Sequence, residues 1–429
     1  MAAQRQLNRT IGVFDAAAIG LGSMLGAGVF VVFAPAFALA GQYLVAAVLL
    51  AGAVAYCNAV ASAVLAAKYP ASGGTYIYGR KQLGEWPGFL AGWGFVTGKT
   101  ASCAAMALTF GHYVAPGWAT PLAVAAVVAL TGVNLLGLTR TALLTRILLG
   151  IVLATLIFVA IAAVSGPHPA DRGDGMAGSL AGTAAGGVAG ILPAAGLMFF
   201  AFAGYARIAT LGEEVKDPQR SIPRAILAAL AAAFVIYVTM ALLLQSHLPP
   251  GILSTSTAPL LDAVNFSRLS QGSWLVQAGA AAACLGALLA LVAGVGRTAM
   301  AMAREGDLPR PLARIGGAHS VPFVAELAVC AAVVVLLLTA DVMTVVGFSS
   351  FGVLLYYAVA NAAAFTLRAH PGYAPKWLNA VGFVACLLLA ITLPLASVLV
   401  MLALLAVGVV GRWGVLKVRS RTTQQGGAA

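Results

Sequence analysis

Apolar runs of membrane-spanning length fill most of this chain and limit how it can fold. A helix needs about 20 mainly apolar residues to cross the hydrocarbon core of a bilayer. Ten such runs lie at about 11–40, 44–67, 86–114, 121–138, 143–164, 185–211, 222–246, 272–303, 321–340 and 342–367. A longer run, 377–410, has Pro394 near its centre and fits a hairpin of two short helices. We therefore expect an all-α polytopic membrane protein with twelve transmembrane helices.

Composition excludes several other classes of protein. Hydrophobic residues make up 61% of the chain and charged residues 8%, which is not the composition of a water-soluble protein. The net charge of +12 comes from short basic clusters between apolar runs, without the basic and aromatic platform of a nucleic-acid-binding protein. All five cysteines fall within apolar runs without metal-ligand spacing. We expect no nucleic-acid partner, no cofactor, no metal site and no disulfide framework.

The distribution of lysine and arginine predicts the orientation of the chain in the membrane. With twelve spans, all 24 of these residues except Lys99, Arg172 and Arg268 fall on one side, which the positive-inside rule assigns to the cytoplasm. We expect a multi-pass protein of the cell (plasma) membrane with both termini cytoplasmic. Residues 1–10 then form the cytoplasmic N-terminus and residues 412–429 a basic tail.

The segments outside the spans are short. Two outer loops, 165–178 and 247–271, carry the prolines and acidic residues of solvated connections, and neither is long enough for a domain. In the tail, a basic cluster is expected to touch anionic membrane lipids. It consists of Arg412, Lys417, Arg419 and Arg421.

Three glycines interrupt the first span near its middle, in residues 22–30, GSMLGAGVF. An unwound turn at membrane depth is tolerated only where it is buried in protein or lines a cavity. The half-helix that begins near Gly26 directs its positive end at the midplane, so the amides of Gly26, Ala27 and Gly28 suit a carboxylate. The alternative is a glycine packing face or a simple kink.

The sixth span shows a second interruption, in residues 196–205, GLMFFAFAGY. Its outer half ends near Phe200–Ala203, where freed carbonyl groups suit an ammonium group, as do those near Ser23 and Met24. Two interrupted helices five spans apart suggest inverted five-helix repeats with a substrate at the midplane. The repeats would be 11–164 and 185–367, which form a ten-helix core, 11–367, followed by two additional helices at 377–411.

Several motifs resemble the amino acid-polyamine-organocation (APC) superfamily of permeases, and together they cover nearly the whole chain. They are residues 22–30, 199–205, 213–223, 294–297, 302–309 and the stretch 70–76, PASGGTY. The resemblance implies an amino acid held between helices one, three, six, eight and ten. The substrate-binding residues it implies are Ser23, Met24, Gly26, Ala27, Gly28, Phe200, Ala201, Phe202, Ala203 and Gly204. Phe202 is the candidate for an aromatic lid, although simple packing would place an aromatic residue there too.

The chain departs from this family at two charged positions. Many relatives carry an acid where this chain has Ala206, and helix five lacks the lysine that some proton-coupled relatives have. Lys99, about half-way through the third span, is the charge that needs an explanation. A lysine at that depth costs about 2.5–3.5 kcal/mol and should face the bundle interior. Burial disfavours its charged form, so Lys99 is either a proton carrier, a counter-charge to the substrate or a structural lysine.

These features favour a secondary active transporter for amino acids or related amines, driven by protons or by exchange. Sodium is disfavoured because residues 275–297 contain no Ser or Thr to ligate it. An ion or small-solute channel is the alternative, although no repeated filter sequence is visible. Titratable groups at membrane depth are too few for an enzyme, and no phosphate-binding loop of an ATPase occurs. Small neutral or acidic amino acids lead as substrates, because Lys99 would repel a second cation.

Other polar residues have structural interpretations. Asp15, Asn134 and Asn361 are expected to form hydrogen bonds between helices. A solvated salt-bridge network is expected at the cytoplasmic end of helix eight. Its members are Arg297, Arg304, Glu305 and Asp307. Glu213 and Glu214 are expected at the inner end of helix six.

Overall fold

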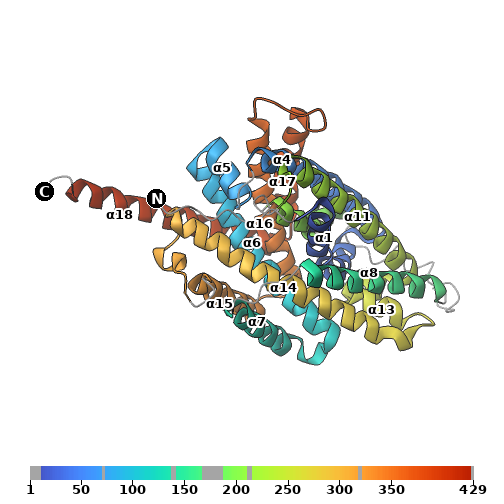
Figure 1. Ribbon diagram of the computed structural model, residues 1–429. Coiled ribbons are helices and arrows are strands. Elements are labelled where there is room, and N and C mark those ends of the chain that lie inside the picture. The colour runs from blue at the N-terminus through green and yellow to red at the C-terminus, as the bar shows by residue number, and fades with distance from the viewer. Residues whose placement is uncertain are drawn as a thin grey trace.

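The computed structural model describes residues 11–69, 73–136, 142–166, 187–209, 215–316 and 321–426. Every regular element in this part of the chain is a helix (Figure 1). Nine helical segments there are long and apolar enough to cross a membrane, and two shorter apolar helices accompany them. The protein is therefore an all-helical, multi-pass membrane protein, and its number of spans stays a prediction. Glu213 and Glu214 lie outside the described residues.

Helices occupy the apolar runs that the sequence indicated. The uninterrupted ones are α4 (Leu44–Lys68), α6 (Glu85–Val114), α7 (Ala119–Leu135), α8 (Ala142–Ser165), α11 (Pro218–His247), α14 (Ser273–Arg304), α15 (Phe323–Thr339) and α16 (Val342–Phe365). The expected hairpin at Pro394 is present as α17 (Lys376–Thr392) and α18 (Leu395–Gly426). The final helix does not end near residue 411, as the sequence suggested, but continues to Gly426 and projects from the body of the molecule (Figure 1).

Close backbone contact joins α6 and α16 through the middle of the bundle (Figure 1). A Cβ atom on Gly352 would lie 2.5 Å from the carbonyl oxygen of Gly94 and 2.8 Å from the Cα atom of Gly98. Small residues allow membrane helices to approach this closely. One turn further along the seam, the hydroxyl oxygens of Ser102 and Ser349 are 2.6 Å apart. This seam fixes α6, the helix that carries Lys99.

Hydrogen bonds between helices involve all three residues expected to form them. Asp15 of α1 (Val13–Met24) pairs with Arg146 of α8. Asn134 donates from Nδ2 to the carbonyl oxygen of Leu289 at 3.0 Å, which joins α7 to α14. Asn361 of α16 donates from Nδ2 to Oδ1 of Asn58 in α4 at 2.6 Å, and both residues are fully buried. These contacts confirm that prediction.

The loop 247–271 differs from the solvated connection that its prolines suggested. It folds into two short helices, α12 (Pro250–Thr255) and α13 (Pro259–Asn265). Proline begins each helix, where the missing N–H group is not needed. Leu253, Leu260 and Val264 are fully buried, so the loop is a packed part of the bundle. Most of the other outer loop, 165–178, lies outside the described residues.

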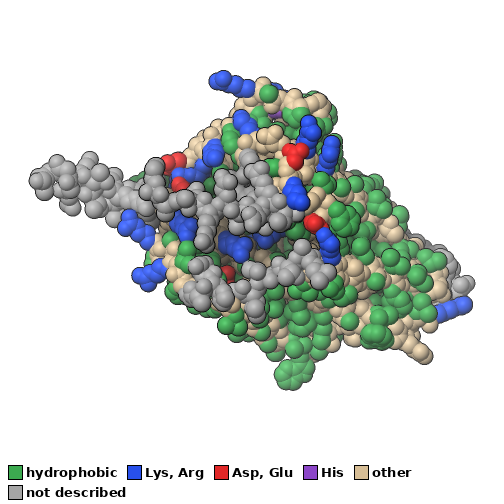
Figure 2. Space-filling view, viewed as in Figure 1, with side chains coloured by type: hydrophobic (Ala, Val, Ile, Leu, Met, Phe, Trp, Pro, Cys, Tyr) green, Lys and Arg blue, Asp and Glu red, His purple; other side chains and the backbone are tan. Residues whose placement is uncertain are grey.

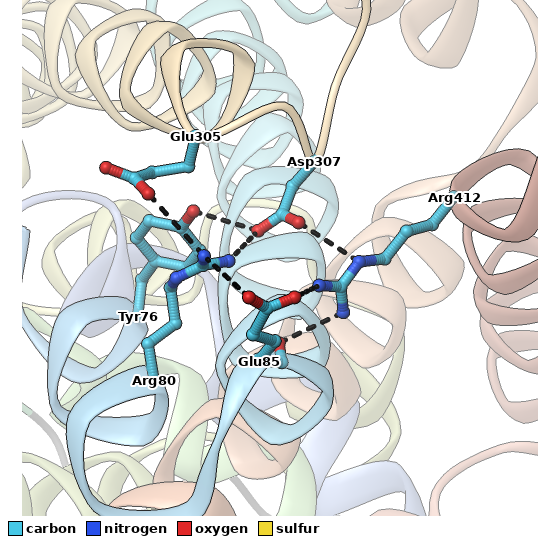
Figure 3. Close-up of polar contacts among 6 residues, drawn as sticks. All are labelled: Tyr76, Arg80, Glu85, Glu305, Asp307 and Arg412. Carbon is cyan, nitrogen blue, oxygen red and sulfur yellow. Dashed lines mark hydrogen bonds and ion pairs between the residues drawn. The ribbon is translucent and has the colours of Figure 1, made fainter. Parts of the chain in front are cut away.

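Basic side chains gather at the end of the molecule that contains α5 (Thr75–Leu83), whereas the lower flank is mainly hydrophobic (Figure 2). At this end lies a cluster of six residues, the Asp307 cluster (Figure 3). Its members are Tyr76, Arg80, Glu85, Glu305, Asp307 and Arg412. Asp307 follows α14 and precedes the 3-10 helix η8 (Arg310–Ala313). The cluster thus joins α5, the start of α6, the end of α14 and the final helix.

Asp307 is the shared acceptor of the Asp307 cluster (Figure 3). Its Oδ2 atom accepts from Arg80 at 2.8 Å and from the Tyr76 hydroxyl at 2.9 Å. Its Oδ1 atom lies 3.0 Å from Nε of Arg412. Burial raises the pKa of Tyr76 well above its usual value, and the charge of Asp307 adds to the rise, so the hydroxyl remains a donor.

Two expectations about this end of the molecule were wrong for one residue each, Asp307 and Arg412. Asp307 is 6% exposed and is therefore not solvated, whereas the other three residues of the expected network, Arg297, Arg304 and Glu305, are exposed. Arg412 is 2% exposed and lies over the rings of Trp86 and Phe89, at 4.4 and 4.9 Å from the ring centroids. Its guanidinium group is therefore enclosed by protein and not available to lipid head groups.

Candidate functional site

The first span is interrupted where its three glycines lie. It is divided into α1, which ends at Met24, α2 (Gly28–Val31) and α3 (Phe33–Ala40). The N–H group of Leu25 still donates to Leu21, at 2.8 Å, and helical bonding resumes when Phe30 and Val31 donate to Ala27. Among the described residues, no acceptor is found for the N–H groups of Gly26, Ala27 and Gly28. Three adjacent amides are thus unpaired at the start of a half-helix, an arrangement that favours an anion.

The sixth span is also interrupted, but by a tighter helical turn and not by an unwound segment. Its helix α9 (Ile191–Phe202) passes into a 3-10 turn, η6 (Ala203–Tyr205), and then into α10 (Ala206–Ala209). A short 3-10 stretch inside a membrane helix often marks a hinge. In a 3-10 turn each N–H group donates to the carbonyl group three residues earlier in place of four. The carbonyl groups at the end of α9 therefore do not have their usual α-helical partners.

The two interruptions pack directly on each other through glycine. A Cβ atom on Gly204 would lie 2.5 Å from the backbone nitrogen of Met24. Conversely, a Cβ atom on Gly28 would lie 2.7 Å from the Cα atom of Ala201. Each interruption therefore uses a residue without a side chain to reach the backbone of the other. Gly26 makes a similar approach to Ala287 of α14, where a Cβ atom would lie 2.7 Å from that of the alanine.

Two side chains from neighbouring helices donate to carbonyl groups at the interruptions. The hydroxyl of Tyr237, in α11, lies 2.7 Å from the Met24 carbonyl oxygen and 3.0 Å from that of Ala201. The ammonium group of Lys99 donates to the carbonyl oxygen of Ala203 at 3.4 Å. Lys99 is only 8% exposed, so it faces the bundle interior as its cost in lipid required. Donors of this protein therefore already bind three of the carbonyl groups that suit an ammonium group, those of Met24, Ala201 and Ala203.

The remaining candidates lie near this junction but differ in what they contact. Ser23 turns its hydroxyl back to the carbonyl oxygen of Ile19, at 2.9 Å. Phe200 is buried, with 7% exposure. The ring of Phe202 is fully buried and lies edge-on to that of Tyr237, with centroids 4.9 Å apart, and beside Phe234. These ring contacts belong to the packing of α9 on α11. They are the contacts expected if Phe202 is a packing residue and not a lid.

Tyr237 is the contact that sequence reasoning missed. It lies within an apolar run with no charged or glycine-rich neighbours to draw attention to it. A tyrosine in such a run reads as a packing residue, because its phenol ring is mainly apolar. Only the fold brings its hydroxyl to both interruptions.

Comparison with known proteins agrees with this architecture. A family described as amino acid permease matches residues 15–423. An uncharacterized transporter of Mycobacterium tuberculosis is 52% identical over 425 residues, which cover 98% of this chain and 94% of that protein. The branched-chain amino acid permease BcaP of Bacillus subtilis is 25% identical, over 75% of this chain and 73% of its own length. Cationic amino acid transporter 7 of Arabidopsis thaliana is 28% identical, over 87% and 68% respectively.

Proposed function

This chain belongs to the amino acid permease family, and we propose that it is a secondary active transporter that moves an amino acid by alternating access. In this proposal the chain has twelve spans, and the first ten form two inverted five-helix repeats. Its basic end, with the Asp307 cluster, faces the cytoplasm. The proposal rests most directly on the meeting of the two interrupted spans, because paired interruptions are where transporters of this kind bind substrate.

We further propose that the substrate carboxylate binds the N–H groups of Gly26, Ala27 and Gly28. These groups are unpaired within the described part of the chain. The positive end of α2 and α3 adds to their attraction for an anion. The substrate ammonium group would bind near the carbonyl groups of Met24 and Ala201, which it would share with the neutral hydroxyl of Tyr237. The carbonyl group of Ala203 is left to Lys99.

A small neutral or acidic amino acid suits this site best. Lys99 places a positive charge beside the carbonyl end of the site, and no acid stands at position 206 to balance a cationic side chain. Repulsion between like charges in a buried site is strong. The branched-chain permease among the relatives is consistent with a neutral substrate. The similarity to a cationic amino acid transporter, at 28% identity, does not decide the substrate.

Uptake into proteoliposomes tests this function. The purified protein is reconstituted and given labelled alanine, leucine, glutamate and arginine, with and without a pH gradient. We expect uptake of a neutral or acidic amino acid that rises with an inward proton gradient or with unlabelled amino acid inside the vesicle. Stimulation by internal substrate identifies an alternating-access carrier, since a channel shows none. If no amino acid moves under either condition, the proposed function is wrong.

A further inference from the structure

The hydroxyl of Tyr237 is bonded to both interrupted spans at once. Its oxygen lies 2.7 Å from the carbonyl oxygen of Met24 and 3.0 Å from that of Ala201. Met24 is the last residue of α1, and Ala201 is the last but one of α9. Carbonyl groups in the last turn of a helix lose their intrahelical partners. Tyr237 therefore supplies a donor to the buried carboxyl-terminal turns of two helices.

We propose that Tyr237 is a positioning residue of the substrate site, which holds the ends of α1 and α9 in register. The inference rests on the proposed function, because it concerns the site at the interruptions. A phenol has one hydrogen to donate, so two carbonyl oxygens within bonding distance must share it. If either helix end moves away, the hydrogen can pass fully to the other. The contact thus fixes the two ends relative to each other and remains satisfied when they separate.

The position of the Tyr237 ring makes this role distinct from ordinary packing. The ring is fully buried and lies edge-on to Phe202, which belongs to the same turn of α9 as Ala201. The glycine contacts between Gly28 and Ala201, and between Gly204 and Met24, bring the same backbone segments together. Packing thus sets the distance between the two ends. The hydroxyl sets their orientation, because hydrogen bonds weaken steeply as they bend.

Replacement Tyr237→Phe removes the hydroxyl and keeps the ring. A matched control is Tyr113→Phe, since Tyr113 is also fully buried and its hydroxyl also makes two hydrogen bonds. It donates to the carbonyl oxygen of Phe30 at 2.9 Å and accepts from the N–H group of Leu260 at 3.3 Å. Neither partner belongs to the ends of α1 and α9. The two variants therefore lose the same number of contacts, and only Tyr237→Phe loses contacts to the ends of α1 and α9.

Both variants are reconstituted beside the wild-type protein and their uptake kinetics are normalised to protein in the vesicles. We expect Tyr237→Phe to raise KM roughly 3- to 10-fold, as the loss of one hydrogen bond predicts, and Tyr113→Phe to leave KM unchanged. Hydrogen exchange of the purified proteins gives a second measurement. Peptides covering residues 19–28 and 198–206 should exchange faster in Tyr237→Phe only.

The outcomes separate this inference from the proposed function. If the wild-type protein transports an amino acid but Tyr237→Phe keeps its KM and its exchange rates, Tyr237 is a packing residue and the inference is overturned. If the wild-type protein transports no amino acid, the proposed function fails. The exchange rates of the two peptides then still decide whether Tyr237 holds the helix ends together.

Discussion

The ammonium group of Lys99 lies 3.4 Å from the carbonyl oxygen of Ala203, in the 3-10 turn that follows α9. A cation of the protein thus binds the interrupted sixth span from α6, the helix that packs most closely on α16. Bonding of this kind depends on charge, because a neutral amine is a weaker donor than an ammonium group. Proton loss from Lys99 would loosen the turn.

Replacing this lysine tests whether it carries the coupled proton. Lys99→Met should abolish uptake driven by a pH gradient, because no proton can then be gained or lost at this position. Lys99→Arg is the control, since it keeps the charge but does not release its proton. If Lys99 carries the proton, exchange of labelled for unlabelled substrate at fixed pH should survive in both variants. Unchanged pH-driven uptake by Lys99→Met would remove the residue from the mechanism.

The glycine contacts between the interrupted spans predict a sharp difference between two similar substitutions. In Gly204→Ala the added methyl group would collide with the Met24 backbone, with an expected cost of about 1–3 kcal/mol of stability and the loss of most transport. In Gly22→Ala the nearest atom is 4.0 Å away, so stability should be unchanged or slightly higher. Thermal unfolding in detergent and uptake in vesicles measure both effects. Equal behaviour of the two variants would contradict the close contact.

The two interpretations of Phe202 differ in what its replacement changes. As a packing residue, Phe202→Leu should lower stability by about 1–2 kcal/mol and affect KM little. Phe234→Leu, which removes the neighbouring ring of α11, should then behave in the same way. As a lid over the substrate, Phe202→Leu should instead raise KM while the unfolding temperature stays near that of the wild type. The paired measurement of KM and unfolding temperature distinguishes the two.

The Asp307 cluster predicts that the final helix contributes to stability through one side chain. Arg412→Met removes the charge that faces Asp307 and leaves Glu85 without its partner in α18. The loss of one member of a buried ion pair costs about 3–5 kcal/mol, although Arg80 and Tyr76 still satisfy the other oxygen of Asp307. We therefore expect a clear fall in unfolding temperature. Arg310→Met, at an exposed position of η8, is the control and should change little; an equally small effect of Arg412→Met would argue against the cluster.

Much of the architecture followed from the sequence because hydropathy and helix breakers are local signals. Pro394 predicted the division between α17 and α18, and the glycines at 22–28 predicted the division between α1 and α2. The cost of burying a charge correctly placed Lys99 in the bundle interior. These predictions needed only the residue types and their spacing. The substrate site itself stays a prediction.

The contacts that the sequence did not reveal join residues far apart in the chain. Arg412 reads as part of a basic tail, and only its pairing with Asp307 and its position over Trp86 show it to be buried. In the sequence, Tyr237 is likewise not distinguished from the other apolar positions of its span. The packing of loop 247–271 was missed because its prolines, typical of turns, stand here at the starts of α12 and α13. Such partners depend on tertiary structure, which a single sequence does not display.

The order of synthesis gives Arg412 a particular place in the biogenesis of this protein. Tyr76, Arg80, Glu85, Glu305 and Asp307 all leave the ribosome before it, and Glu85 lies 327 positions earlier in the chain. Until α18 inserts, Oδ1 of Asp307 lacks its arginine and the rings of Trp86 and Phe89 lack their cover. A chain interrupted during translation would therefore keep the pair of Asp307 with Arg80 but leave the second carboxylate oxygen and two aromatic rings without their partner.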